Sequence, residues 1–109
     1  MSDCEIAYTS FDTPTRILTL NRVELQIEGT IHPTQKPVKL YSWILQQFAR
    51  PGMRILDTHA GSASSLIACH RFGELEYIGF EIDEDYFRAA SARLNFEKAQ
   101  IRIFDSEVT

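Results

Sequence analysis

Two acidic residues, Asp57 and Glu81, end or follow short apolar runs and could together hold a small polar ligand. Gly61 follows Asp57 closely and stands 20 residues (81 − 61) before Glu81. In a unit of alternating strands and helices, an acid at about this distance from the first glycine loop binds ribose hydroxyls. A carboxylate suits that task because it accepts two hydrogen bonds at once, and a glycine lets the backbone approach a ligand closely.

The loop after Asp57 does not match a dinucleotide site. The G-x-G-x-x-G spacing is absent, because Ala63 stands two residues after Gly61. Asp57 would also repel a pyrophosphate. A ligand with a ribose and a positive charge but no phosphates fits the two acids better, and S-adenosylmethionine (SAM) is the obvious candidate. Spacing alone leaves open that Asp57 only caps the loop and that Glu81 is a strand-end acid facing water.

The elements that must position these acids form a predicted βαβαβ unit over residues 54–104. Strands are expected at Arg54–Asp57, Tyr77–Ile82 and Ile101–Phe104, with a helix over Leu66–Arg71 after the small-residue loop. Right-handed crossovers would make their sheet parallel, so the predicted fold class is α/β and Rossmann-like.

The second helix of this unit should follow Asp83, whose side chain can cap it. Its inner face is expected to carry Phe87, Ala90 and Leu94, which recur at helical spacing.

Two further elements are predicted upstream. Apolar residues at period two in Cys4–Thr9 and a β-branched run in Arg16–Val23 predict a β-hairpin over residues 4–23. Residues 32–49 carry a proline-punctuated motif and then a helix, since apolar residues fall at helical spacing between Pro37 and the Pro51-Gly52 stop.

The composition indicates a single small domain and excludes several classes of protein. Its 109 residues are 44% hydrophobic and 24% charged, which suits one globular domain rather than a disordered chain. A net charge of −4 argues against a broad basic face for nucleic acid. Cys4 and Cys69 form no CxxC pair, so we expect free thiols in a reducing cytosol and no metal site. Without a leader or an apolar run of about 20 residues, a cytoplasmic protein without membrane contact is expected.

Three motifs in a fixed order carry a resemblance to a known family. They are HPTQKPV at residues 32–38, ILDTHAGS at residues 55–62 and YIGFEID at residues 77–83. Together they resemble the SAM-dependent DNA amino-methyltransferases, which modify the exocyclic amine of adenine or cytosine, in the subgroup with permuted motif order. The segment at residues 4–17 is similar to phage-borne members, and the likeness covers roughly residues 4 to 95.

The resemblance implies a Rossmann-like methyltransferase fold with SAM as cofactor. By position, Asp57 and Gly61 would line the methionine end of SAM, and Glu81 would hold the ribose hydroxyls. The full set of cofactor-binding residues implied by the motifs is Thr34, Gln35, Lys36, Asp57, Thr58, His59, Ala60, Gly61, Ser62, Glu81 and Asp83. The first three of these would close over the methionine moiety.

The chain departs from the family pattern in ways that limit its predicted activity. Relatives carry a D-P-P-Y-type loop that holds the target amine, whereas the sequence here offers only Asp12-Thr13-Pro14-Thr15, a superficial echo that we interpret as a hairpin turn. His59 and Ala63 replace an apolar residue and a second glycine. We therefore expect no catalytic residues and a SAM-binding portion of a DNA methyltransferase, truncated, split or degenerate, that is inactive alone.

Two alternatives and a prediction about assembly accompany this interpretation. The chain could be a non-catalytic interaction module with a methyltransferase fold or, with less support, a fragment of a nicotinamide-dependent oxidoreductase. DNA would be bound through a complete enzyme or a partner chain. Because the strand Arg54–Leu56 would be left as a sheet edge, a homodimer or a complex with a separate chain supplying the missing half is expected, unless the hairpin docks there.

Overall fold

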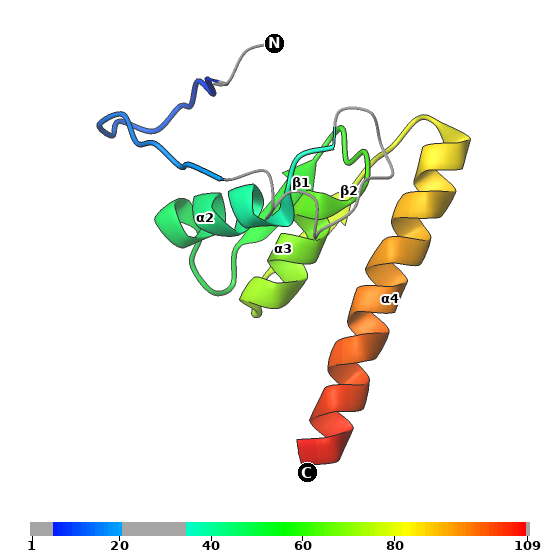
Figure 1. Ribbon diagram of the computed structural model, residues 1–109. Helices are drawn as coiled ribbons and strands as arrows, with labels where there is room; N and C mark the ends of the chain where they lie inside the picture. Colours follow the sequence, from blue (N-terminus) through cyan, green and yellow to red (C-terminus); the bar gives the residue numbers. More distant parts are fainter. Residues whose placement is uncertain (1–5, 21–34, 109) are drawn as a thin grey trace.

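The computed structural model describes residues 6–20 and 35–108, and it has an α/β architecture (Figure 1). The elements in chain order are α2 (Val38–Phe48), β1 (Arg54–Asp57), α3 (Ser64–Phe72), β2 (Glu76–Gly79) and α4 (Glu84–Val108). β1 and β2 pair in parallel, with Ile55 opposite Tyr77 and Leu56 opposite Ile78. The segment β1–α3–β2 is therefore a βαβ unit, as the pattern of the sequence predicts.

Local sequence explains where α2 begins and ends. Pro37 precedes the helix in an extended conformation with φ −70°, which its ring favours. The helix buries Val38 and Leu45 and ends where Ala49 becomes extended, two residues before Pro51. This helix lies within the range 32–49 expected for the second upstream element.

The structure corrects the prediction of a third strand at Ile101–Phe104. These residues lie within α4, an uninterrupted helix of 25 residues, about 37 Å long at 1.5 Å per residue. Residues 84–108 contain no glycine or proline to stop a helix, and a four-residue run with three apolar residues cannot by itself distinguish a strand from a helix. Within the described ranges the sheet has two strands and the unit is βαβα, and α4 projects beyond the rest of the molecule (Figure 1).

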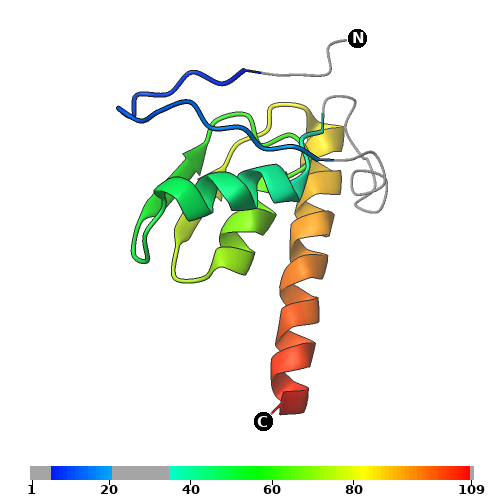
Figure 2. The ribbon, with the colours of Figure 1, turned by 60° about the vertical axis from the view of Figure 1, so that its left-hand side comes forward.

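The predicted hairpin over residues 4–23 also differs from the structure, as far as the chain is described. Residues 6–20 contain no strand, and residues 1–5 and 21–34 lie outside the described ranges. An isolated two-stranded hairpin is marginal in water, and this arm is instead held by α2 (Figure 2). Phe11 stacks on Phe48 with ring centroids 4.3 Å apart, and Arg16 lies 5.4 Å from the same ring while donating to Gln47 Oε1 at 2.7 Å.

The core lies between α2, α3 and one face of the sheet. Val38, Leu45, Ile67 and Cys69 are all at most 7% exposed, and Ile55 packs against them from β1. α4 contacts α3 through Ala90, which is buried, and Leu94. Phe87, expected on the inner face of α4, is instead 52% exposed. Among α2, α3 and α4 as described, none combines the length and apolarity that a bilayer crossing requires.

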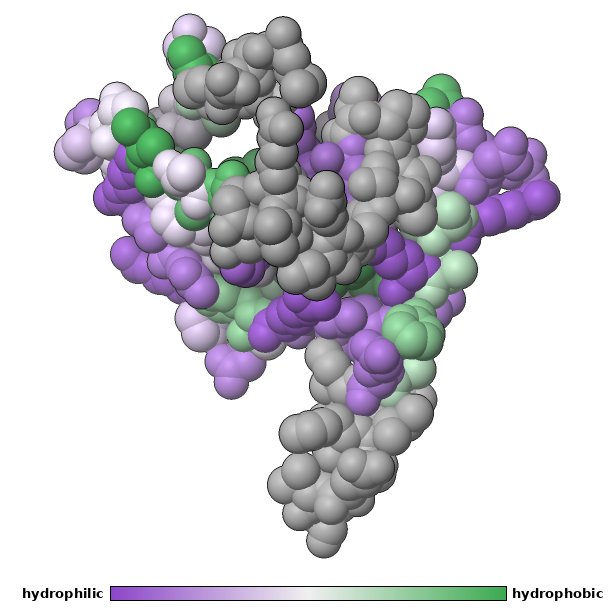
Figure 3. All heavy atoms as spheres, viewed as in Figure 1, coloured by the Kyte–Doolittle hydropathy of each residue, from purple (hydrophilic) through white to green (hydrophobic). Residues whose placement is uncertain are grey.

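Figure 3 shows how hydrophobic and hydrophilic residues divide on one side of the molecule. Hydrophobic residues gather on the N-terminal arm, where Ile6 and Ile17 are 75% and 84% exposed. Hydrophilic residues cover the beginning of α4, where Glu84 and Asp85 occupy the first turn. Acidic side chains there complement the positive end of the helix dipole.

Candidate cofactor site

The two acids singled out in the sequence, Asp57 and Glu81, lie at the same end of the sheet. The pairing of β1 with β2 continues beyond the strands, since Phe80 N donates to Asp57 O at 2.9 Å and Ala60 N donates to Phe80 O at 2.8 Å. This extension brings Glu81 beside the loop that follows Asp57. The carboxyl ends of parallel strands are where α/β folds place their ligands.

The side chain of Glu81 connects the two strand ends through backbone amides. Its Oε1 accepts a hydrogen bond from Gly61 N at 3.0 Å, and its Oε2 accepts one from Asp83 N at 2.9 Å. Gly61 has φ +56°, a left-handed conformation that glycine adopts without steric cost. Each carboxylate oxygen has a second lone pair that these bonds leave unused, so Glu81 both orders the loop and keeps the capacity to accept from a ligand.

Asp57 caps the loop with both of its carboxylate oxygens. Oδ1 accepts from His59 N at 2.9 Å, and Oδ2 accepts from Ser65 Oγ at 2.5 Å. Capping was one of the two readings that spacing alone left open, and it leaves the negative charge in place. That charge acts on the buried thiol of Cys69, whose pKa is raised to about 11 first by burial and then by Asp57. The thiol is therefore protonated at neutral pH.

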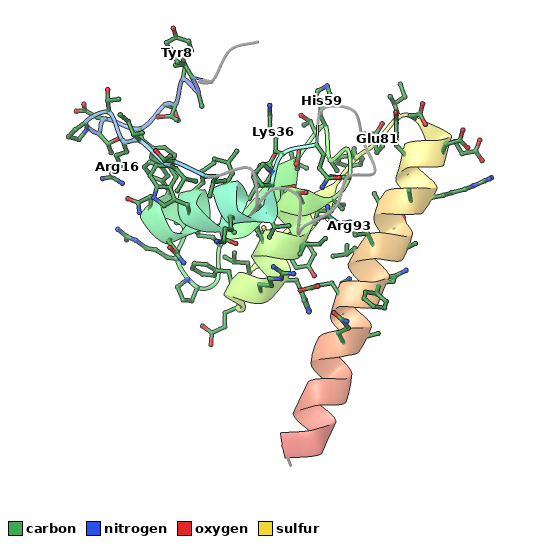
Figure 4. All side chains as sticks on the ribbon, viewed as in Figure 1. Tyr8, Arg16, Lys36, His59, Glu81 and Arg93 are labelled. Atoms are coloured by element: carbon green, nitrogen blue, oxygen red, sulfur yellow. The ribbon has the colours of Figure 1, made fainter. Side chains whose placement is uncertain are left out.

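The remaining loop residues divide between exposed and buried positions. Thr58 and His59 are exposed and contact each other, with Thr58 Oγ1 2.9 Å from His59 Nδ1. Figure 4 shows His59, Glu81 and Lys36 toward the same end of the molecule. Gln35 and Lys36 are half-buried just before α2, whereas Thr34 lies outside the described residues.

Ser62 and Asp83 both form hydrogen bonds within the protein through their side chains, Ser62 at a buried position and Asp83 at an exposed one. The hydroxyl of Ser62 is buried and lies 3.1 Å from Ser64 Oγ. Asp83 accepts from Tyr86 N at 3.0 Å through Oδ1 and so caps α4, which agrees with the cap expected from the sequence.

Arg93, in α4, contacts the loop and was not found from the sequence. Its Nη1 donates to Ser62 O at 3.0 Å and to Ser64 Oγ at 2.8 Å, and lies 3.3 Å from Ser62 Oγ. Figure 4 shows the side chain between α4 and the body of the protein. The hydroxyl-rich segment after Gly61 is a visible signal, but nothing in the sequence pairs it with an arginine 31 residues away.

Ala63 precedes α3 in the left-handed region, with φ +68°. This conformation costs an L-residue roughly 1–2 kcal/mol, and it explains why a second glycine is the expected residue here. Among the residues that the structure describes, no three His, Cys, Asp or Glu side chains gather as metal ligands would.

Comparison with known proteins finds methylases and methyltransferases. Residues 9–92 match the model of a family described as DNA methylase. The Escherichia coli (strain K12) protein YubD, which is named as a methylase, is 41% identical over 63 residues, or 58% of this chain and 27% of its own. The type II methyltransferase M2.DpnII of Streptococcus pneumoniae is 35% identical over 66 residues, or 61% of this chain and 24% of its own.

A third relative, the type II methyltransferase M2.LlaDCHI of Lactococcus lactis subsp. cremoris, is 33% identical over 64 residues, or 59% of this chain and 23% of its own. The chain thus spans about a quarter of the length of the curated relatives that it matches. No solved structure matches it significantly.

Proposed function

Since the chain belongs to the DNA methylase family, we propose that it is the SAM-binding portion of a methyltransferase acting on the exocyclic amine of adenine or cytosine in DNA. The observation that carries the proposal is the hydrogen bond from Gly61 N to Glu81 Oε1 at 3.0 Å. It joins the glycine loop to the acid of the next strand at the ligand-binding end of a parallel sheet. On this view β1–α3–β2 belongs to a larger Rossmann-like sheet.

The residues present suit a ribose that carries no phosphate. Glu81 retains lone pairs for two hydroxyls, and Gly61 has no side chain to obstruct the ligand. Ile82, beside Glu81, is fully exposed and offers an apolar surface to the base attached to that ribose.

The charge around the loop suits a cation. Asp57, Glu81 and Asp83 are all acidic, and the loop of residues 57–62 contains no lysine or arginine. The nearby cation is Arg93 of α4, whose guanidinium is bonded to Ser62 and Ser64. Coulomb attraction from these carboxylates would favour the sulfonium and ammonium groups of SAM and oppose a pyrophosphate. Glu81 would hold the ribose of SAM, and Asp57 and Gly61 would line its methionine end; the chemistry that SAM would supply there is an electrophilic methyl group.

Calorimetric titration with SAM tests the proposal. Wild-type protein should bind SAM and its demethylated product, and Glu81→Ala should weaken binding by about 1–3 kcal/mol, because ribose hydroxyls lose their partner. Glu76→Ala is the matched control, since Glu76 is an exposed acid at the opposite end of β2 that pairs only with Arg54 at 2.7 Å among the ion pairs of the described residues. NAD should bind none of these three proteins. Equal SAM affinity for wild type and Glu81→Ala would remove Glu81 from the site.

Methyl transfer is expected to need more than this chain. The amine-binding tetrapeptide is absent from the sequence, so the purified 109-residue protein should not incorporate tritiated methyl groups into mixed-sequence DNA. Incorporation above the level of the Glu81→Ala variant would contradict this part of the proposal.

A further inference from the structure

The turn that leads into α3 has a strained residue at its centre. Ala63 has φ +68° and is 2% exposed. Both of its backbone groups are in use, since its N–H donates to Ala60 O at 2.9 Å and its carbonyl accepts from Ile67 N at 2.9 Å. A rotation of Ala63 to an ordinary negative φ would disrupt these bonds. The strain therefore persists only if other contacts hold the turn.

Arg93 bonds to the residues on both sides of this alanine (Figure 4). Its Nη1 donates to Ser62 O at 3.0 Å and to Ser64 Oγ at 2.8 Å. Ser62 and Ser64 are 4% and 2% exposed, and hydrogen bonds that are shielded from water in this way are stronger than those at the surface. A cation beside the first turn of a helix is disfavoured by the helix dipole, so these bonds must offset that cost.

The position of the arginine is itself set by α4. Ala63 and Ala90 of α4 are buried in one cluster, which fixes the helix against the turn. Glu97 follows Arg93 by four residues and so shares its side of the helix. The pKa of Glu97 is lowered first by the hydrogen bond from Arg71 and further by nearby positive charges that include Arg93. The guanidinium is thus placed by packing before it in α4 and by a carboxylate after it.

We propose that Arg93 is a positioning residue of the candidate cofactor site, which holds the left-handed turn at Ala63 and so keeps the Gly61 amide directed at Glu81. Gly61 stands two residues before Ala63, and its N–H donates to Glu81 Oε1 at 3.0 Å. A rotation at Ala63 would displace this amide. A glycine at position 63 would adopt the same conformation without strain, so the arginine compensates for the alanine that stands there.

Hydrogen exchange of the ligand-free protein tests the hold on the loop. In Arg93→Met, exchange of the Gly61 amide should accelerate about tenfold more than that of Phe80, whose N–H bonds to Asp57 O at 2.9 Å beside β1. The matched control is Arg88→Met, which removes an exposed pair with Glu84 from the same helix and should leave both rates unchanged. Equal acceleration of the two amides would mean that Arg93 only stabilises the fold, and it would overturn the proposal.

Calorimetry with SAM measures the consequence for binding, and this part rests on the proposed function. Arg93→Met should weaken SAM binding about tenfold, as expected when hydrogen bonds from a charged group are lost. Adding Ala63→Gly should restore the affinity to within about threefold of wild type, because glycine adopts the turn without strain. If Arg93 acted only on stability, the further loss of a buried methyl group would enlarge the defect instead, and this outcome would contradict the proposal.

The two measurements separate this proposal from that of SAM binding. A wild-type protein that binds no SAM would contradict the proposed function alone, and the exchange rates would still decide the role of Arg93. If Arg93→Met does not fold, Ser64→Ala takes its place, because it removes the acceptor 2.8 Å from the guanidinium. Its effects should be about threefold, since one bond is lost rather than all, and Ala63→Gly should again reverse them. A Ser64→Ala defect that Ala63→Gly enlarges would overturn the proposal.

Discussion

The two faces of the β1–β2 sheet have similar apolar sequences but different surroundings. On the packed face, Ile55 and Tyr77 meet a core in which Ile67 is 2% exposed, and Gly79 allows α3 to approach so closely that a Cβ would be 2.8 Å from Leu66 Cδ1. On the other face, Leu56 and Ile78 pair with each other and remain more than half exposed. Apolar character alone therefore does not tell which residues stabilise this chain; the alternation along the strand and the position of α3 do.

Truncating one isoleucine on each side gives the largest expected contrast. Ile67→Ala should lower the free energy of unfolding by about 2–5 kcal/mol, because it leaves a cavity in the core. Ile78→Ala should change it by at most about 0.5 kcal/mol, because its side chain is already largely in water. Urea denaturation of the two variants measures both values. Similar losses would mean that the sheet face of Leu56 and Ile78 is covered in the isolated protein.

Arg93 offers a second contrast, between a partly buried arginine and an exposed one on the same helix. Arg93→Met leaves the carbonyl of Ser62 and the buried hydroxyls of Ser62 and Ser64 with fewer partners, so it should cost about 1–3 kcal/mol of stability and weaken SAM binding. Arg88→Met removes only an exposed pair with Glu84 at 2.5 Å, a change worth about 0.3–0.5 kcal/mol. Equal effects of the two substitutions would show that the contact of Arg93 with the loop contributes neither to stability nor to SAM binding.

The smallest expected effect concerns acid stability at the contact between α3 and α4. The hydrogen bond from Arg71 lowers the pKa of Glu97 below its ordinary value of 4.5, against the effect of partial burial. Because the folded-state pKa is the lower one, the ionised carboxylate stabilises the protein above pH 4.5, and this contribution disappears as the pH falls through the folded-state pKa. Glu97→Gln should reduce the acid sensitivity of stability in that range, measured by thermal melting from pH 6 to pH 3. An unchanged profile would contradict the role of this pair.

The sequence predicts the part of the fold that is governed by short-range patterns. The β1 strand at Arg54–Asp57, the helix after the small-residue loop and the cap at Asp83 depend on local residue types, and the structure contains all three. The contact between Gly61 and Glu81 is also predictable, because a parallel βαβ unit brings its strand ends together.

The remaining features depend on information that lies outside such patterns. Ile101–Phe104 has the composition of a strand, but it continues a helix that no glycine or proline interrupts. Arg93 reaches the loop only because α4 packs beside α3, a tertiary contact without a local signature. The arm at residues 6–20 is held by the Phe11–Phe48 stack rather than by strand pairing.

An amide spectrum recorded during a SAM titration tests the central claim most directly. SAM should shift the amide signals of Gly61 and Asp83, whose N–H groups bond to Glu81, in a saturable way. The signal of Gly73, which follows α3, should not move. Saturable shifts at Gly61 and Asp83 that disappear in Glu81→Ala would match the proposed site. Shifts confined to Gly73, or none at saturating SAM, would contradict it.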